Sequence, residues 1–278
     1  MAELGKYNTL TIAREVDFGV YLDASEGIEI LMPSRYLPSE YQIGDTVNVF
    51  VYRDSEDRLI ATTETPFAQV GDFVFLEVVG VSAFGAFLDW GLLKDLFVPH
   101  KEQKAKMQLG GKYLVYIYID EETDRITASA KIDRYVSKET PPFNPGDKVD
   151  LLIYQFSDLG YKAIINNRYG GMLYEDETFR HLPIGCKTTG YIKQVREDNK
   201  IDLLLDEPGY GKVGGVSEEI LNYLETNDGY LALNDKSPSE DIYEAFGVSK
   251  KTFKKAIGDL YKRRLITIEQ AGIRKTKN

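Results

Sequence analysis

The chain has very few residues of the types that bind metals or form disulfides. Its 278 residues include one Cys and two His. A single cysteine, Cys186, excludes an intramolecular disulfide, and such sparse cysteine suits a reducing cytosol. His100 and His181 do not stand at a metal-ligand spacing with Cys186. The sequence therefore predicts no metal site and no other cofactor.

Long apolar runs are also missing. No stretch approaches the roughly 18 apolar residues that a membrane-spanning helix needs. Residues 1–20 lack the charged start and the apolar run of a signal peptide. We therefore expect a cytoplasmic protein with no membrane partner.

No catalytic constellation stands out in the sequence. Carboxylates are abundant, but clusters such as Glu121-Glu122 are typical of solvated turns. We therefore expect a binding protein and not an enzyme. A metal-dependent nuclease built from scattered Asp residues is the enzymatic alternative.

Positive charge is scarce except at one end of the chain. The net charge is -10, which argues against indiscriminate binding of polyanions by the whole molecule. Residues 249–278, however, contain 10 basic and 2 acidic side chains, a balance of +8. A basic end on an acidic body is typical of a contact with a polyanion.

A sequence pattern recurs at fixed offsets. The residues that return 66 positions later are Gly5, Phe18, Gly19, Leu22, Pro33, Asp54 and Ile60, matched by Gly71, Phe84, Gly85, Leu88, Pro99, Asp120 and Ile126. A fainter third copy follows 75 positions further on, where Gly160 matches Gly85. A period this long indicates independent modules that do not share one core. The sequence predicts three such domains, at 1–66, 67–136 and 143–207.

The second repeat has the pattern of five short strands. They are expected at 73–81, 83–89, 95–99, 112–119 and 125–129, with a helical turn within 101–109. Gly85, inside the second strand, indicates a bend or a bulge. Five short strands with a helical turn after the third are the layout of an OB-type barrel. We therefore predict a mainly β protein, with three tandem OB-fold barrels followed by an α+β domain.

The motifs of the second repeat resemble the S1 RNA-binding domain. The likeness lies in the runs 81–88 (VSAFGAFL), 96–99 (LFVP) and 125–131 (RITASAK). In that family two aromatics, a His, an Asp and an Arg contact nucleic acid. The resemblance implies that the RNA-binding residues here are Phe84, Phe87, Asp120 and Arg125. Pro99 stands at the position of the His.

The other two repeats resemble this pattern to different degrees. In the first repeat the matching positions are Phe18, Tyr21, Asp54 and Arg58, with Pro33 in place of the His. The resemblance implies RNA contacts by the two rings and by Arg58. The third repeat has Leu159 and Lys162 at the aromatic positions, so its stacking face is largely lost. We interpret it as a divergent barrel.

The paired aromatics admit two interpretations. Rings that face solvent on a barrel can stack on bases. Phe and Tyr in a β-rich sequence also pack in cores, and recurrence at one register shows only that the fold needs the residue. Asp54 and Asp120 can likewise cap the turn before the fifth strand.

The region after the third repeat has the pattern of a winged-helix domain, which we place at 214–278. A Gly-rich connector is expected at 207–215, where Gly209–Lys212 lacks the full spacing of a phosphate-binding loop. The expected elements are a helix at 218–224 capped by Ser217, a strand at 230–233, a helix at 241–246, a helix at 250–263 capped by Ser249, and a hairpin of 265–268 with 273–275. The residues expected to face its core from the last helix are Phe253, Ile257, Leu260 and Tyr261.

The last helix also carries a row of cations. Those that lie away from its apolar positions are Lys251, Lys254, Lys255, Lys262 and Arg263. Cations near phosphates give salt-dependent binding, and Lys lacks the bidentate base readout of Arg, Asn and Gln. We therefore expect these residues to bind RNA. A solvated basic face and a protein-docking surface are the alternatives.

The order of the domains resembles the conserved virulence factor B (CvfB) family of bacterial regulators. Much of this likeness lies in the run 237–256 (SPSEDIYEAFGVSKKTFKKA). The resemblance implies binding of single-stranded RNA and regulation of gene expression after transcription. Two alternatives stay open. One is a DNA-binding transcriptional regulator that uses the winged helix, and the other is an adaptor that docks on a protein partner.

Overall fold

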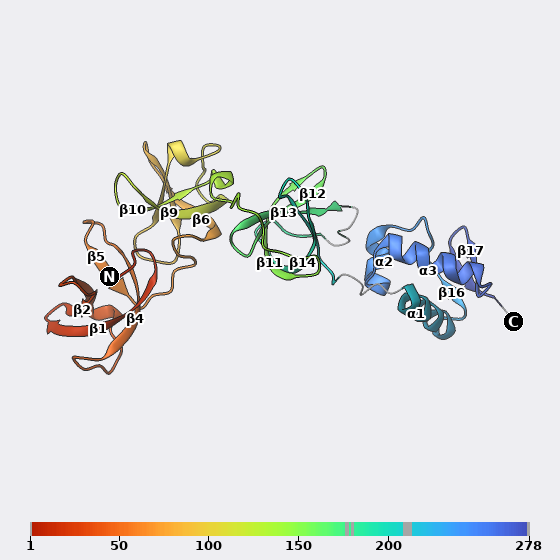
Figure 1. The fold of residues 1–278 in the computed structure, drawn as a ribbon, viewed down its shortest axis with the longest axis horizontal. Helices are drawn as coiled ribbons and strands as arrows, with labels where there is room; N and C mark the ends of the chain where they lie inside the picture. The colour runs from red at the N-terminus through yellow and green to blue at the C-terminus, as the bar shows by residue number, and fades with distance from the viewer. Residues whose placement is uncertain (1, 176–177, 179–180, 208–212, 277–278) are drawn as a thin grey trace. The chain divides into compact units, whose positions relative to one another are not determined.

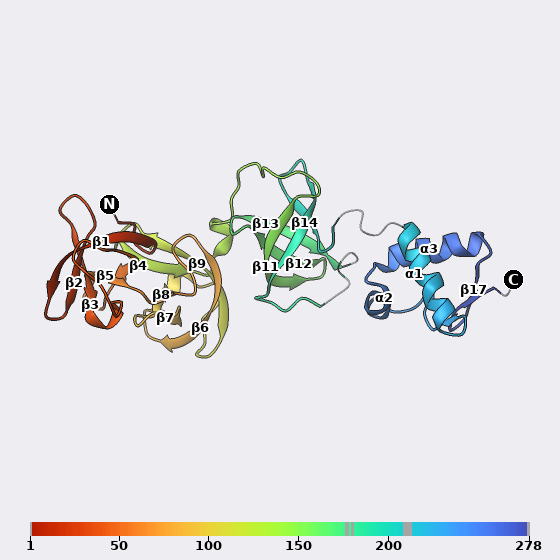
Figure 2. The same ribbon diagram turned by 90° about the horizontal axis from the view of Figure 1, so that it is seen from below.

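The computed structural model describes residues 2–175, 178, 181–207 and 213–276. The chain divides into two compact units, Met1–Val136 and Ser137–Asn278. The first unit contains two closed barrels, and the described residues of the second form a third barrel and a small region of helices and short strands (Figures 1 and 2). The predicted fold class is therefore confirmed.

Each barrel is built from five strands. Those of the first barrel are β1 (Tyr7–Val16), β2 (Gly19–Asp23), β3 (Glu29–Pro33), β4 (Thr46–Arg53) and β5 (Leu59–Thr62). Those of the second are β6 (Phe73–Val81), β7 (Gly85–Asp89), β8 (Leu96–Pro99), β9 (Lys112–Asp120) and β10 (Arg125–Ser129). Those of the third are β11 (Lys148–Ser157), β12 (Gly160–Ile165), β13 (Tyr169–Tyr174), β14 (Lys187–Val195) and β15 (Ile201–Leu204). The predicted helical turn of the second repeat is a short 3₁₀ helix, η2 (His100–Glu102).

All three barrels close in the same order. The first strand pairs with the second and the fourth, and the third and fifth strands pair in parallel to complete the closure. Each first strand has a β-bulge at the same register, between Ile12 and Arg14, Val78 and Gly80, and Ile153 and Gln155. A bulge bends a strand and increases its twist, which helps a small sheet to close. The spacings of 66 and 75 residues thus reflect one barrel geometry used three times.

The glycine at the start of each second strand is required by a close approach between strands. A Cβ at Gly19, Gly85 or Gly160 would overlap a carbonyl oxygen of the third strand. Gly85 also lies against the ring of Phe97. The bulge lies in β6 and not at Gly85, where the glycine lets β7 and β8 approach.

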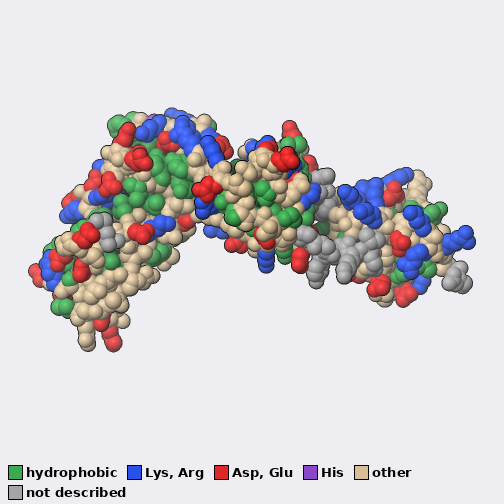
Figure 3. Space-filling view, viewed as in Figure 1, with side chains coloured by type: hydrophobic (Ala, Val, Ile, Leu, Met, Phe, Trp, Pro, Cys, Tyr) green, Lys and Arg blue, Asp and Glu red, His purple; other side chains and the backbone are tan. Residues whose placement is uncertain are grey.

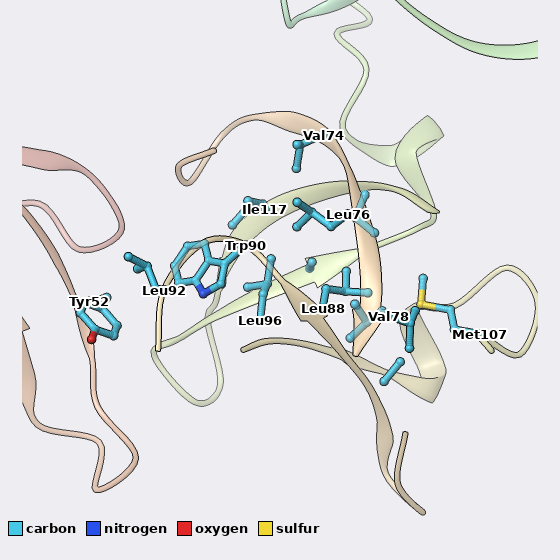
Figure 4. Close-up of a cluster of buried hydrophobic side chains, with 14 of the residues drawn as sticks. Tyr52, Val74, Leu76, Val78, Leu88, Trp90, Leu92, Leu96, Met107 and Ile117 are labelled. Atoms are coloured by element: carbon cyan, nitrogen blue, oxygen red, sulfur yellow. The ribbon is translucent and has the colours of Figure 1, made fainter. Parts of the chain in front are cut away.

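One hydrophobic core joins the first two barrels. Phe50 of β4 packs edge-on against Trp90 of the second barrel, with ring centroids 5.7 Å apart. Tyr52, also from the first barrel, belongs to the same cluster (Figure 4). Trp90 is 3% exposed, and its indole N–H donates a 2.6 Å hydrogen bond to the carbonyl oxygen of Lys94. Separating the two barrels would expose these rings to water.

The C-terminal region contains three helices and three strands in its described residues. They are α1 (Val213–Thr226), β16 (Tyr230–Leu231), α2 (Ser239–Phe246), α3 (Lys250–Lys262), β17 (Ile266–Glu269) and β18 (Gly272–Lys275). The side chain of Ser249 caps α3 as predicted, because its hydroxyl accepts a 2.9 Å hydrogen bond from the N–H of Thr252. The predicted hairpin is β17 with β18. Residues 208–212 of the expected connector lie outside the described residues.

Two predictions for this region are wrong. The first helix begins at Val213, so Ser217 lies inside it and is buried, and is not its cap. Tyr261 is 56% exposed and does not face the core. It follows Phe253 by eight positions, which rotates it by about 80° from the face that Phe253 and Leu260 share.

We expect Trp90→Ala to destabilise both barrels of the first unit. Loss of a buried Trp or Phe side chain typically costs about 3–5 kcal/mol, and this ring also supports Phe50 of the other barrel. Hydrogen exchange of the full chain should become faster in 7–62 and in 73–129, and stay unchanged in 148–204. Leu109→Ala, which shortens an exposed side chain of the second barrel, should have little effect. Faster exchange in the second barrel alone would show that the two cores are independent.

Candidate nucleic-acid interface

A pocket opens between the two barrels of the first unit. Its volume is about 670 Å³, within the roughly 300–1,000 Å³ that small-molecule sites occupy. The loop between β4 and β5 of the first barrel forms one side of it. The other side comes from β7, β8 and β10 of the second barrel, together with the segments that precede them. The pocket therefore exists only because the first barrel packs on the second.

Three phenylalanine rings form the apolar side of the pocket. Phe84 lies just before β7 and is 79% exposed. Its N–H donates a 3.1 Å hydrogen bond to the hydroxyl of Ser82, which holds the short turn. Phe87 and Phe97 face each other across β7 and β8, with ring centroids 5.3 Å apart. An open ring beside a packed pair provides a surface on which bases can stack.

Charged side chains form the polar side of the pocket. Arg125, at the start of β10, is paired with Asp57 in the β4–β5 loop of the first barrel. The Nζ of Lys94 lies 3.7 Å from a carboxylate oxygen of Asp57 and donates a 2.6 Å hydrogen bond to the carbonyl oxygen of Asp54. The hydrogen bond from Arg125 lowers the pKa of Asp57, so this carboxylate is ionised at neutral pH.

Arg53 ties the same loop to the second barrel. Its guanidinium pairs with the carboxylate of Asp124, in the turn between β9 and β10. Another of its nitrogens donates a 2.9 Å hydrogen bond to the carbonyl oxygen of Asp57. The loop of the first barrel is therefore held against the nucleic-acid side that the S1 resemblance assigns to the second barrel.

Asp120, which the resemblance assigns to RNA binding, is engaged in a turn. One of its carboxylate oxygens accepts hydrogen bonds of 3.2 Å and 3.0 Å from the N–H groups of Glu122 and Thr123. Asp54 does the same in the first barrel, where it accepts from the N–H groups of Glu56 and Arg58. The structure thus shows the capping role that the sequence left open, and an RNA contact by Asp120 stays a prediction.

The matching face of the first barrel is partly covered. Phe18 is exposed. The ring of Tyr21 lies under Arg14, whose guanidinium carbon is 4.0 Å from the ring centroid. Arg14 in turn forms a 2.6 Å ion pair with Glu29. Arg58 is exposed and forms ion pairs within its own loop. One ring of the predicted pair is therefore open to solvent, and the other is stacked on a cation.

The third barrel has a different surface at the same positions. Leu159 is exposed where the second barrel has Phe84. The hydroxyl of Tyr174 accepts a 2.6 Å hydrogen bond from Arg196, which also donates at 2.9 Å to the buried carboxylate of Asp202. The open aromatic ring is thus replaced by an aliphatic residue beside an internally paired polar cluster.

The cations of α3 lie on its outer face. Phe253 and Leu260 point into the core of the C-terminal region. The exposed lysines, none of which forms an ion pair with a described residue, are Lys251, Lys254, Lys255 and Lys262. Arg263 is exposed as well and lies 3.3 Å from the carboxylate of Asp259. Figure 3 shows Lys and Arg side chains at the surface of this region.

Of the pocket residues, sequence reasoning identified Phe84, Phe87 and Arg125. Those it missed include the charged side chains Arg53, Asp57 and Lys94 and the ring of Phe97. Phe97 stands in the run 96–99 that carries part of the S1 resemblance, so its position on the third strand was the available signal. Asp57 and Arg125 are 68 positions apart in different repeats. No local pattern connects them, because their pairing depends on how one barrel packs on the next.

The described residues provide no candidate metal centre. Among them, no three His, Cys, Asp or Glu side chains are grouped in a way that could hold a metal ion. Their helices are all too short or too polar to cross a membrane.

Two protein families match parts of this chain. The S1 domain family matches residues 4–64 and 70–131, which include the first two barrels. The CvfB-like winged helix domain family matches residues 218–274. S1 and winged-helix domains indicate nucleic-acid binding, and neither is known as an enzyme family.

Several proteins are similar to this chain over most of its length. The protein YitL of Bacillus subtilis (strain 168) is 28% identical over 93% of this chain and 89% of its own. Conserved virulence factor B of Staphylococcus saprophyticus is 26% identical over 86% of this chain and 82% of its own. A crystal structure of a multidomain protein with nucleic acid binding domains from Streptococcus pneumoniae aligns with 98% of both chains, at 24% identity and a TM-score of 0.42. The chain therefore combines S1 domains with a CvfB-like winged helix domain and is a relative of the proteins named conserved virulence factor B.

Proposed function

We propose that this protein is a regulator that binds single-stranded RNA and affects gene expression after transcription. The observation that carries the proposal is the pocket between the first two barrels, where the open ring of Phe84 stands near Lys94 and Arg125. A ring can stack on any base whose faces are open, and cations attract the phosphates that join the bases. In a duplex the bases are already stacked on each other, so this combination suits a single strand.

The basic face of α3 supports the same function from the C-terminal end. Its four exposed lysines belong to a segment with a charge of +8 in a chain of -10. Lysine is a compact point charge and lacks the planar fork that reads base edges. We therefore assign α3 to electrostatic attraction of the phosphate backbone and the barrel pocket to contact with bases.

A DNA-binding transcriptional regulator is the second candidate. The observation that favours it is the CvfB-like winged helix domain, whose α3 is exposed and basic and is followed by the β17–β18 hairpin. Helices of this kind bind along the grooves of duplex DNA in helix-turn-helix proteins. The two candidates differ in the nucleic acid that the full chain prefers, single-stranded RNA or duplex DNA of the same sequence.

We expect Phe84→Ala to weaken RNA binding and to leave the fold intact, because the ring is largely exposed. Stacking on an aromatic ring contributes about 1–3 kcal/mol per base, which corresponds to a loss of roughly 5- to 150-fold in affinity. Fluorescence anisotropy with a labelled oligouridine of about 12 nucleotides measures this. Phe67→Ala removes another exposed ring of the same unit, one that does not line the pocket, and should bind normally. Equal affinities of the wild type and Phe84→Ala would remove the ring from the binding site.

A second prediction concerns the charge of α3. Reversing Lys251, Lys254 and Lys255 to Glu should weaken binding and flatten its salt dependence. Each phosphate that the protein no longer neutralises reduces the slope of log K against log salt by about 0.7 for a single strand. The matched control reverses three exposed lysines near or on the third barrel, Lys138, Lys148 and Lys187, with the same change in net charge. If the two triple variants behave alike, α3 makes no specific contribution and the barrels carry the binding.

A further inference from the structure

We propose that Asp57 of the first barrel occupies the place of an RNA phosphate in the pocket of the second barrel, so that RNA binds there by displacing an internal carboxylate. The proposal rests on the proposed function, and it adds that a carboxylate of the protein itself competes with RNA for the same site. Its ligand class is the phosphodiester backbone of a single strand whose base stacks on Phe84.

The contacts of Asp57 are those that a phosphate would make. One of its carboxylate oxygens is paired with the guanidinium of Arg125, and the other lies 3.7 Å from the Nζ of Lys94. Arginine and lysine are the side chains that bind phosphate oxygens in proteins, by forked hydrogen bonds and by point charge respectively. A carboxylate held between them presents two anionic oxygens, as a phosphodiester does.

The loop that carries Asp57 is built to hold it in this position. Asp57 has a φ of 63°, in the left-handed region, where Asp and Asn are better tolerated than most residues. Its carbonyl oxygen accepts a 2.9 Å hydrogen bond from Arg53, and its N–H donates to the carbonyl oxygen of Asp54 at 3.1 Å. Asp54 also caps the loop through the N–H groups of Glu56 and Arg58. The carboxylate is therefore directed at the neighbouring barrel by a fixed backbone.

The ion pair is nevertheless open to solvent. The side chains of Asp57 and Arg125 are 38% and 58% exposed. Water and salt screen a pair of this kind, which makes it weak enough for an incoming phosphate to replace. Phe84 lies in the same pocket with its ring open, so one strand can contact both. The buried packing of Phe50 on Trp90 keeps the barrels together when the ion pair opens.

Competition by Asp57 has two measurable consequences. The free protein must break its internal pair before RNA can bind, which lowers the apparent affinity. The carboxylate that RNA displaces from Arg125 becomes free to attract a salt cation from solution. RNA binding by the wild type therefore releases fewer salt cations overall than binding by a variant without this carboxylate. Removing the carboxylate should therefore tighten binding and steepen its salt dependence together.

The experiment compares the full-length wild type with Asp57→Asn, in which the amide keeps the shape of the side chain and tolerates the left-handed backbone. Binding of a labelled oligouridine of about 12 nucleotides is measured at several salt concentrations. We expect Asp57→Asn to bind roughly 2- to 5-fold more tightly at low salt, as the range for exposed ion pairs implies. Its slope of log K against log salt should be steeper than that of the wild type. Asp57→Gly, which suits the same backbone, repeats the test if the Asn variant folds poorly.

Two controls separate competition from other effects. Glu121→Gln makes the same change in net charge four positions before Arg125, and Glu121 forms no ion pair with a described residue. It should leave both the affinity and the slope near those of the wild type. In the background of Arg125→Ala, the gain from Asp57→Asn should shrink, because the competitor loses its closest cation and keeps only Lys94, at 3.7 Å.

The outcomes distinguish this proposal from the proposed function. If the wild type binds RNA and Asp57→Asn binds no better, Asp57 is not a competitor, although the RNA-binding function stands. A gain that is as large in the Arg125→Ala background as in the wild type, or that Glu121→Gln reproduces, also overturns the proposal. If none of the proteins binds the single strand, both proposals are wrong.

Discussion

The packing of Phe50 against Trp90 is the interaction on which the candidate site depends. It buries rings from two barrels in one core and so fixes the first barrel on the second. The loop between β4 and β5 then lies across from β7, β8 and β10, and the open pocket between them is lined by Phe84 and Arg125. Two separate barrels would each present one side of this pocket to solvent. The candidate nucleic-acid interface therefore requires both barrels in contact.

Charge is distributed so that attraction is local. Residues 1–248 carry an excess of acidic side chains, yet the pocket gathers Arg53, Lys94 and Arg125 at one place, beside the carboxylate of Asp57. A cluster of cations inside an acidic body attracts phosphates only at short range, because salt screens charges beyond about 10 Å. The basic face of α3, by contrast, belongs to a segment with few acidic side chains. The two surfaces thus differ in the distance over which they attract phosphates. That difference suits the proposed division, in which the pocket contacts bases and α3 attracts the backbone.

One barrel geometry supports three different surfaces. The bulge in the first strand and the glycine at the start of the second recur in all three barrels, because closure of a small sheet demands them. Barrel closure does not depend on which side chains stand at the aromatic positions. They are Phe84 in the second barrel, Phe18 in the first and Leu159 in the third, and the S1 family matches only the first two barrels. The fold therefore places the surface, and the side chains decide what it can bind.

The barrels and the winged helix could be predicted from the sequence, because strand alternation, recurring glycines and the Ser249 cap act over a few residues. The start of α1 and the side chain of Tyr261 were misplaced, since a helix end and the edge of a helix face depend on what packs against them. Whether Phe84 faces solvent or a core was also open until the fold was known. The pairing of Asp57 with Arg125 follows from the tertiary structure alone, because residues 68 positions apart in two separately closed barrels meet only through the packing of one barrel on the other.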